Sequence, residues 1–247
     1  MVRKLFTPRW ILIHLGVVLL IFTMINLGMW QLRRLDEKRT LNSAVASRTE
    51  MPVVELTAEN VSPLSEWQRV SFTGTYISDK SVTIINRSNN GTAGYNSAVP
   101  FRTDFGAVVL VNRGFVPLAT ANPSPPVGTL TVVGYLRPSQ SRGTLGAIDS
   151  SDPTTTEFQR FDIPLIMKHV EAEPFPMYVQ LIKELPDPKQ QLPTKVALPE
   201  PSEGSHMSYA VQWFFFSTVA LAAWIVVIRR RLRDTTNGDP VQSETSA

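Results

Sequence analysis

Histidine is scarce in this chain, so imidazole chemistry has few candidate residues. The sequence contains His14, His169 and His206 but no cysteine, which excludes disulfides, thiolate metal sites and thiol nucleophiles. His206 stands just before a long apolar run that begins at Tyr209 and contains Trp213. An imidazole near aromatic rings at a water–lipid boundary suits a haem, because haem iron takes an axial histidine while the macrocycle rests in apolar surroundings.

Each histidine also has a purely structural interpretation. His206 is also suited to capping a helix or hydrogen bonding at the membrane interface, and neither role needs a ligand. His14 lies within the first apolar run, where polar groups serve helix packing, and His169 has the charged neighbours of a surface residue. If the two apolar runs form helices that lie side by side, His14 and His206 differ by roughly 20 Å in depth, too far to share a metal ion.

Arg113 is the other candidate, because it follows the apolar run 107–112. A guanidinium is able to clamp a carboxylate, such as a haem propionate or an acidic group of a partner. The alternative is a buried ion pair or a backbone anchor at a strand end. The sequence shows neither a nucleophile elbow nor paired catalytic carboxylates, and 91–94 lacks the Lys-Ser/Thr pair of a phosphate loop. We therefore expect a protein that is not an enzyme.

Two uncharged apolar runs, 10–30 and 209–228, must position these residues. A helix of about 20 residues covers the roughly 30 Å of hydrocarbon in a bilayer, so each run predicts a transmembrane helix. The first run is longer than a signal-peptide core and lacks a small-x-small cleavage site, which predicts that it is retained.

Basic residues predict the orientation of the two spans. Four arginines within 229–233 follow the second span and three basic residues within 1–9 precede the first, so both termini are expected in the cytoplasm. Basic residues within 33–39 oppose this assignment. The flanking positions of these residues also account for the pI of about 9.3 without a nucleic-acid partner.

The chain is expected to have five parts: a cytoplasmic N-terminus at 1–9, a transmembrane helix at 10–30, an extracytoplasmic β-rich domain at 31–208, a transmembrane helix at 209–228 and a basic, polar cytoplasmic tail at 229–247. Within the domain, 31–47 lacks Gly and Pro and predicts a helical stalk. The Pro-rich stretch 186–205 predicts an extended linker that returns to the membrane.

Period-2 patterns predict a mainly antiparallel β domain. The expected strands are 67–76, 81–86, 95–101, 107–112, 130–136, 158–163 and 177–183. Asn89-Asn90-Gly91 and Asp104-Phe105-Gly106 have the chemistry of hairpin turns. A short helix is expected to begin near Pro164.

Four blocks of sequence, in order along almost the whole chain, carry a resemblance to a known family. They are Gly28-Met29-Trp30-Gln31-Leu32-Arg33-Arg34 with Lys38; Gly74-Thr75-Tyr76; Gly94-Tyr95 followed by Val109-Leu110-Val111-Asn112-Arg113-Gly114-Phe115-Val116-Pro117; and His206-Met207-Ser208-Tyr209-Ala210-Val211-Gln212-Trp213-Phe214. Together they resemble the SURF1 family, assembly factors of haem-copper cytochrome c oxidase. Two positions depart from the family pattern: Gly204-Ser205 replaces an asparagine before the histidine, and Phe115 replaces a tryptophan.

The resemblance implies a two-span protein with a barrel-like β domain that helps to place haem a into oxidase subunit I. In some bacteria such a protein stays with the oxidase or a respiratory supercomplex. The missing Arg- and Ser-rich presequence favours a bacterial plasma membrane. The family's haem-related histidine maps onto His206, which is then the expected ligand of the haem iron. From geometry we add Tyr209 and Trp213 at the ring border, and Arg33, Arg34 or Arg113 at the propionates.

Two other functions remain open. A permanent accessory subunit would bind the oxidase without haem, through the small residues Ala220, Ala222 and Ala223. A copper-delivery factor would need cysteine, histidine or clustered methionine ligands, and the methionines here are scattered.

Overall fold

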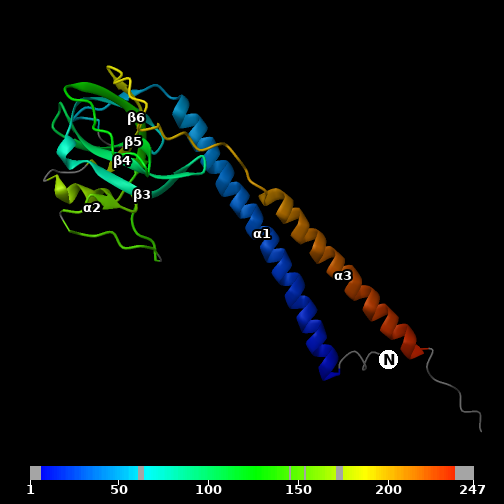
Figure 1. The fold of residues 1–247 in the computed structure, drawn as a ribbon. Helices are drawn as coiled ribbons and strands as arrows, with labels where there is room; N and C mark the ends of the chain where they lie inside the picture. Colours follow the sequence, from blue (N-terminus) through cyan, green and yellow to red (C-terminus); the bar gives the residue numbers. More distant parts are fainter. Residues whose placement is uncertain (1–6, 61–63, 145, 153, 171–174, 237–247) are drawn as a thin grey trace, which may run out of the picture. The chain divides into compact units, whose positions relative to one another are not determined.

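The computed structural model describes residues 7–60, 64–144, 146–152, 154–170 and 175–236 (Figure 1). The chain divides into two units. The first consists of residues 1–43 and 201–247 and is built from two long helices. The second, residues 44–200, contains an eight-stranded sheet.

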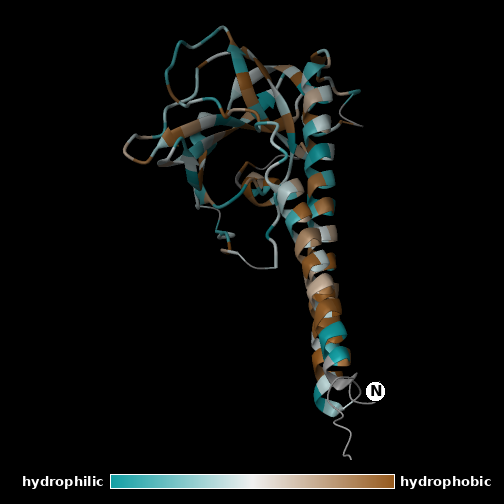
Figure 2. Cartoon of the chain, turned by 90° about the vertical axis from the view of Figure 1, so that its right-hand side faces the viewer, coloured by the Kyte–Doolittle hydropathy of each residue, from teal (hydrophilic) through white to brown (hydrophobic). Residues whose placement is uncertain are grey.

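The two long helices are α1, Pro8–Glu50, and α3, His206–Thr236. Both are long and apolar enough to cross a membrane, and Figure 2 shows hydrophobic residues along both of them. α1 continues through 31–47 without a break, as expected for a stretch that lacks Gly and Pro. The prediction of two apolar helices on either side of a β domain is confirmed.

A stripe of shielded positions runs along each helix in steps of three and four residues. On α1 these positions are Trp10, His14, Val17, Ile21, Met24, Gly28 and Gln31. On α3 they are His206, Ala210, Trp213, Ser217, Ala220, Trp224 and Ile228. This spacing keeps one face of a helix against a partner helix. The shielded stripes therefore form the seam of a helix pair.

Contacts along the seam show that the pair is antiparallel. The His14 ring lies 4.8 Å from the Trp224 ring, whereas Gln31, later in α1, contacts His206 at the start of α3. Between these ends, a Cβ atom at Gly28 would lie 2.8 Å from the Phe214 ring. Glycine therefore permits the close approach of the two helices at this level.

Five strands of the second unit close into a barrel. They are β2 (Arg69–Tyr76), β4 (Thr92–Thr103), β5 (Val108–Pro117), β6 (Leu130–Pro138) and β8 (Met177–Leu185). The hydrogen-bonded order is β2-β6-β8-β5-β4, and β4 pairs with β2 to complete the circle. The β5–β8 pair is parallel and the other pairs in the circle are antiparallel. Closure leaves these strands without a long free edge.

Shorter elements surround the barrel. β3 (Val82–Asn89) pairs with β4 and also with β7 (Glu157–Phe158), while β1 (Val54–Glu55) pairs with β2. The short helices are η2 (Ser78–Lys80), α2 (Ile163–Ile166) and η3 (Met167–His169). Asn90 and Gly91 join β3 to β4 with φ values of 48° and 79°. Positive φ at both positions matches a two-residue hairpin turn and confirms the predicted loop.

Alternation along β5 divides the hydrophobic core in two. Val109 and Val111 belong to the cluster inside the barrel, which also contains Val70, Phe72, Phe101, Val132 and Val179. Val108 and Leu110 belong to a second cluster that includes Ile84, Phe158, Ile163 and Ile166. α2 thus covers the outer face of the sheet beside β3 and β5.

The structure corrects one predicted strand. Residues 158–163 do not form a strand, because β7 ends at Phe158 and α2 begins at Ile163. The Asp162 carboxylate accepts a hydrogen bond from the Leu165 amide at 3.2 Å. An aspartate in this position caps a helix N-terminus, and that local preference outweighs the apolar pattern of the run.

The predicted return linker is partly packed against the barrel. Phe115 and Thr194 exchange two backbone hydrogen bonds of 2.8 Å, and the Gln180 side chain donates to the Val196 carbonyl at 3.0 Å. Residues 186–196, which we call the return segment, therefore belong to the fold of the β unit.

Candidate functional site

His206 occupies the first position of α3, where the helix pair ends. Its Nδ1 atom lies 2.8 Å from Oε1 of Gln31 on α1. The ring is partly buried. His206 is therefore held between the two helices and is not a freely rotating surface side chain.

Glycine lies beside the other edge of the His206 ring. Gly204 has a φ of 65°, and a Cβ atom at this position would lie 3.5 Å from Cδ2 and 3.7 Å from Nε2 of His206. A Cβ atom there would be in ordinary van der Waals contact with the ring, so glycine keeps position 204 from covering the Nε2 edge with a side chain. The donor set at this end thus fits an imidazole that would hold a haem iron, because Nδ1 is engaged by Gln31 and Nε2 has no hydrogen-bond partner among the described residues.

A charged pair lies next to His206. The Arg39 guanidinium donates from Nε and one terminal nitrogen to the two oxygens of Glu203, at 2.7 and 3.0 Å. These hydrogen bonds lower the pKa of the Glu203 carboxyl below its usual value. Arg34 is paired with Glu37 at 2.6 Å. Two of the basic residues that opposed the predicted orientation therefore have acidic partners.

The two aromatic candidates extend from His206 into the apolar part of α3. Tyr209 is one turn below His206 and 49 % exposed. Trp213 is two turns below, on the seam, and its ring meets Phe216 edge to face at 6.3 Å. The structure therefore brings His206 and Trp213 onto one face of α3, while Tyr209 lies on its exposed side.

The opposite end of the helix pair carries a different cluster. The rings of Trp10 and His14 both lie against Trp224, at 6.1 and 4.8 Å, and the Arg231 guanidinium is 5.9 Å from the Trp10 centroid. These contacts place His14 in a packing role between the helices. They lie at the opposite end of the helix pair from His206.

Arg113 lies in the β unit, and a bulge in β5 determines its direction. Ser97 on β4 pairs with Gly114 and Ala98 pairs with Asn112, so Arg113 is the extra residue. Its side chain is 1 % exposed. β8 has a similar irregularity, because Lys183 and Leu181 pair with successive residues of β6 and Ile182 is skipped. This shift turns Glu184 into the barrel.

Each nitrogen of the Arg113 guanidinium has a partner within the protein. Nε lies 3.3 Å from Oε1 of Glu184, and the terminal nitrogens donate to the Pro123 carbonyl at 3.1 Å and to Gln190 Oε1 at 3.0 Å. Tyr76 donates its hydroxyl to the same Glu184 oxygen at 2.7 Å. Burial, followed by the charge of Glu184, raises the pKa of Tyr76 well above its usual value. This geometry favours the structural role of Arg113 over a propionate clamp.

The backbone geometry explains why glycine follows Arg113. Gly114 has a φ of 133°, and a Cβ atom there would lie 2.2 Å from the Thr194 carbonyl oxygen. At Gly94, likewise, a Cβ atom would lie 2.2 Å from the Val116 carbonyl oxygen. These two glycines of the matched sequence blocks therefore allow close backbone approach.

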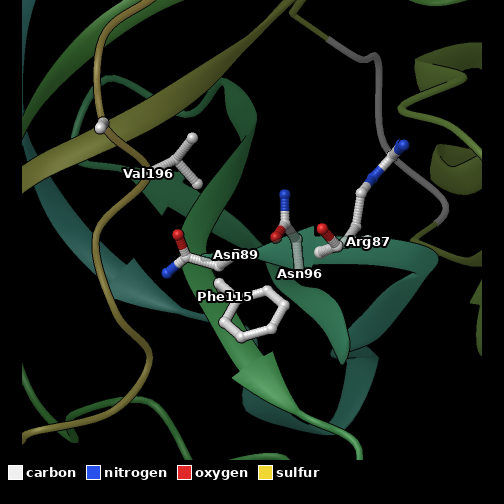
Figure 3. Close-up of a pocket in the computed structure, with 7 residues that line it drawn as sticks. Arg87, Asn89, Asn96, Phe115 and Val196 are labelled. Carbon is white, nitrogen blue, oxygen red and sulfur yellow. The ribbon is translucent and has the colours of Figure 1, made fainter. Parts of the chain in front are cut away.

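A small hollow lies between the β3–β4 hairpin, β5 and the return segment. Arg87, Asn89, Asn96, Phe115 and Val196 line it (Figure 3). Its volume of about 170 Å³ is below the roughly 300–1,000 Å³ typical of small-molecule sites. The Arg87 guanidinium points away from the Phe115 ring (Figure 3) and donates to the Gln159 carbonyl at 3.0 Å. This hollow is too small to hold a macrocyclic cofactor.

Comparison with known proteins decides the family. The model of the SURF1 family matches residues 18–218. The chain belongs to the SURF1 family. Among its relatives, a SURF1-like protein of Monosiga brevicollis is 26% identical over 223 residues, which cover 83% of each chain. An uncharacterized SURF1-like protein of Mycobacterium tuberculosis is 27% identical over 228 residues, covering 87% of this chain and 82% of the relative. The human Surfeit locus protein 1 is 24% identical over 238 residues, covering 87% and 76%.

Within this SURF1 family site, sequence reasoning assigned no role to Gln31. The residue was part of the block after the first span, but its contact with His206 joins positions 175 apart in the chain. A signal was available, because Gln31 is a polar residue at the end of an apolar run, in a helix expected to pack beside the one that His206 begins.

Proposed function

We propose that this SURF1 family member assists the biogenesis of haem-copper cytochrome c oxidase. It would hold haem a transiently through His206 and hand it to oxidase subunit I, without enzymatic chemistry. The membrane would be a bacterial plasma membrane, with the β unit on its outer side and both termini in the cytoplasm. A bound haem would supply an iron centre, which the His206 imidazole would hold, and an apolar ring, which Tyr209 and Trp213 would border.

The observation that carries the proposal is the setting of His206. Its imidazole is fixed at the end of the apolar helix pair, with one nitrogen bonded to Gln31 and the other edge beside Gly204. Trp213 follows two turns deeper on the same face. Family membership supports the link to the oxidase, and this geometry supports His206 as the contact. Arg33, exposed on α1, and Arg34 are the remaining candidates for propionates.

The test is the visible absorption spectrum of the full-length protein purified in detergent from cells that make haem a. The expected wild-type spectrum contains haem a, and His206→Ala loses or shifts it. His169→Ala, which changes the histidine of the β unit, is the matched control and should keep the wild-type spectrum. A colourless wild type would contradict haem binding.

An accessory-subunit role is the second candidate. Ala222 and Ala223 are exposed on α3, so another helix is able to approach closely there. A colourless wild-type protein that copurifies with the oxidase, and still does so as His206→Ala, would favour this role. Loss of copurification on replacing both alanines with leucine would locate the interface.

A further inference from the structure

We propose that Gln31 is a positioning residue for His206: its carbonyl oxygen selects the Nδ1–H tautomer of the imidazole and so presents the Nε2 lone pair to a haem iron. The axial part of this inference rests on the function proposed above. The selection of the tautomer stands on the geometry of the apoprotein and is measurable without haem.

The tautomer follows from the chemistry of the contact. An amide carbonyl oxygen accepts hydrogen bonds and has no proton to donate. The 2.8 Å contact between Gln31 Oε1 and His206 Nδ1 therefore requires the proton to be on Nδ1. In a neutral imidazole the lone pair is then on Nε2, the nitrogen that is left to bind a metal.

The seam explains why Gln31 is able to hold this bond. Gln31 lies three residues after Gly28, on the same shielded stripe of α1. Close approach of the helices at Gly28 and Phe214 keeps the two backbones near one another just below the contact. The hydrogen bond is also partly buried, which limits the competition from water.

The residues just before His206 differ from the family pattern, which makes the contact between Gln31 and His206 more important for holding the ring. Gly204-Ser205 precedes His206 where the family pattern has an asparagine. The Ser205 carbonyl accepts hydrogen bonds from the Tyr209 amide and the Ser208 hydroxyl, and the described structure shows no hydrogen bond from the Ser205 hydroxyl to the His206 ring. Gln31 is the side chain whose hydrogen bond to the His206 ring the described structure shows.

A partner on the non-ligating nitrogen has known effects on a metal ligand. It fixes the ring orientation and raises the basicity of the ligating nitrogen, and its loss typically lowers metal affinity on the order of 10-fold to 100-fold. We expect Gln31→Leu to weaken haem binding by this factor. Gln31→Glu keeps an acceptor on Nδ1, so it should restore affinity and shift the haem midpoint potential downward.

The first measurement is ¹⁵N NMR of the full-length apoprotein, labelled only in histidine, in detergent micelles. The chain has 3 histidines, so His206→Ala assigns the signal. The expected wild-type signal shows a protonated Nδ1 and an unprotonated Nε2. Gln31→Leu should give a mixture of tautomers, whereas Gln212→Leu, at an exposed position of α3, should leave the signal unchanged. A wild type protonated on Nε2 would overturn the inference.

The second measurement is titration of the same variants with haem a, followed by absorption and by redox potentiometry. Equal affinity and potential in wild type and Gln31→Leu would overturn the positioning role and leave the proposed function intact. A wild type that binds no haem would overturn the proposed function and the axial role with it. The NMR result then still decides whether Gln31 fixes the tautomer.

Discussion

At the scale of single residues, the matched sequence blocks combine two kinds of requirement. Arg113 and Gly114 are explained by the barrel, because one is the extra residue of a bulge and the other meets the return segment. Packing leaves one part of His206 unexplained, since only Nδ1 of its ring has a hydrogen-bond partner among the described residues. A resemblance between sequences does not distinguish residues required by the fold from residues available for binding. The burial of each side chain in the structure does.

We expect Arg113→Met to destabilise the β unit without removing a haem contact. The change leaves the Glu184 carboxylate buried without its cationic partner, which typically costs about 3–5 kcal/mol. The double variant Arg113→Met/Glu184→Leu also removes the unpaired buried carboxylate and should recover much of the lost unfolding free energy. Denaturant unfolding of the full-length protein, followed by near-ultraviolet circular dichroism, measures both.

Haem absorbance per folded molecule is the companion measurement. It should match the wild type in Arg113→Met, because the guanidinium is inside the barrel. If Arg113→Met has wild-type stability but no longer binds haem, Arg113 would instead be assigned the role of a propionate clamp.

The sequence identified His206 as a candidate but did not identify its partner. Scarcity of histidine and the position before an apolar run were sufficient to select it. Identifying Gln31 would have required knowing which faces of the two helices, which are distant in sequence, contact each other. Charge and composition were likewise unable to show that Arg113 is buried, because its acidic partner Glu184 is 71 residues away.

At the scale of elements, regular patterns predicted the fold and irregular ones did not. The two apolar runs and most strands were visible as long periodic stretches. The bulges at Arg113 and Ile182 were not, since a bulge inserts one residue without changing composition. The return segment was also hidden, because its prolines indicate an extended chain and say nothing about what it packs against.

Gly114→Ala should loosen the return segment. The added Cβ atom combines strain at positive φ, roughly 1–3 kcal/mol, with a collision against the Thr194 carbonyl. Gly106→Ala is the matched control, because its φ is 92° and a Cβ atom there would meet nothing within 4 Å. We expect trypsin to cut faster after Lys189 and Lys195 in Gly114→Ala, as mapped by mass spectrometry. Cleavage of Gly114→Ala at the same rate as Gly106→Ala and the wild type would contradict this prediction.

At the scale of the whole molecule, the two long helices and the β unit correspond to the predicted order along the chain. Antiparallel pairing of α1 and α3 brings the start of one helix beside the end of the other. The start of α1 and the end of α3 therefore belong to one end of the helix pair, where the four arginines of 229–233 lie. The positive-inside trend predicts a cytoplasmic location for that end, which is the orientation proposed above.

Single cysteines test this orientation, because the natural chain contains none. Val127 in the β unit is 98% exposed, and Thr7 lies just before α1 and is also exposed. A membrane-impermeant maleimide should label Val127→Cys in intact spheroplasts and Thr7→Cys only after the membrane is permeabilised. The reverse pattern would invert the orientation, and labelling of both would exclude a first span.

The position of β8 in the barrel governs the order in which the molecule is completed during synthesis. β8 is the last strand in the chain, yet it lies between β5 and β6. Until residues 177–185 emerge, both neighbours have open edges and the Arg113 pocket lacks its carboxylate. α3 follows only at His206. The barrel and the helix pair are thus finished by the last third of the chain, so a prematurely terminated product would have neither a closed domain nor a second span.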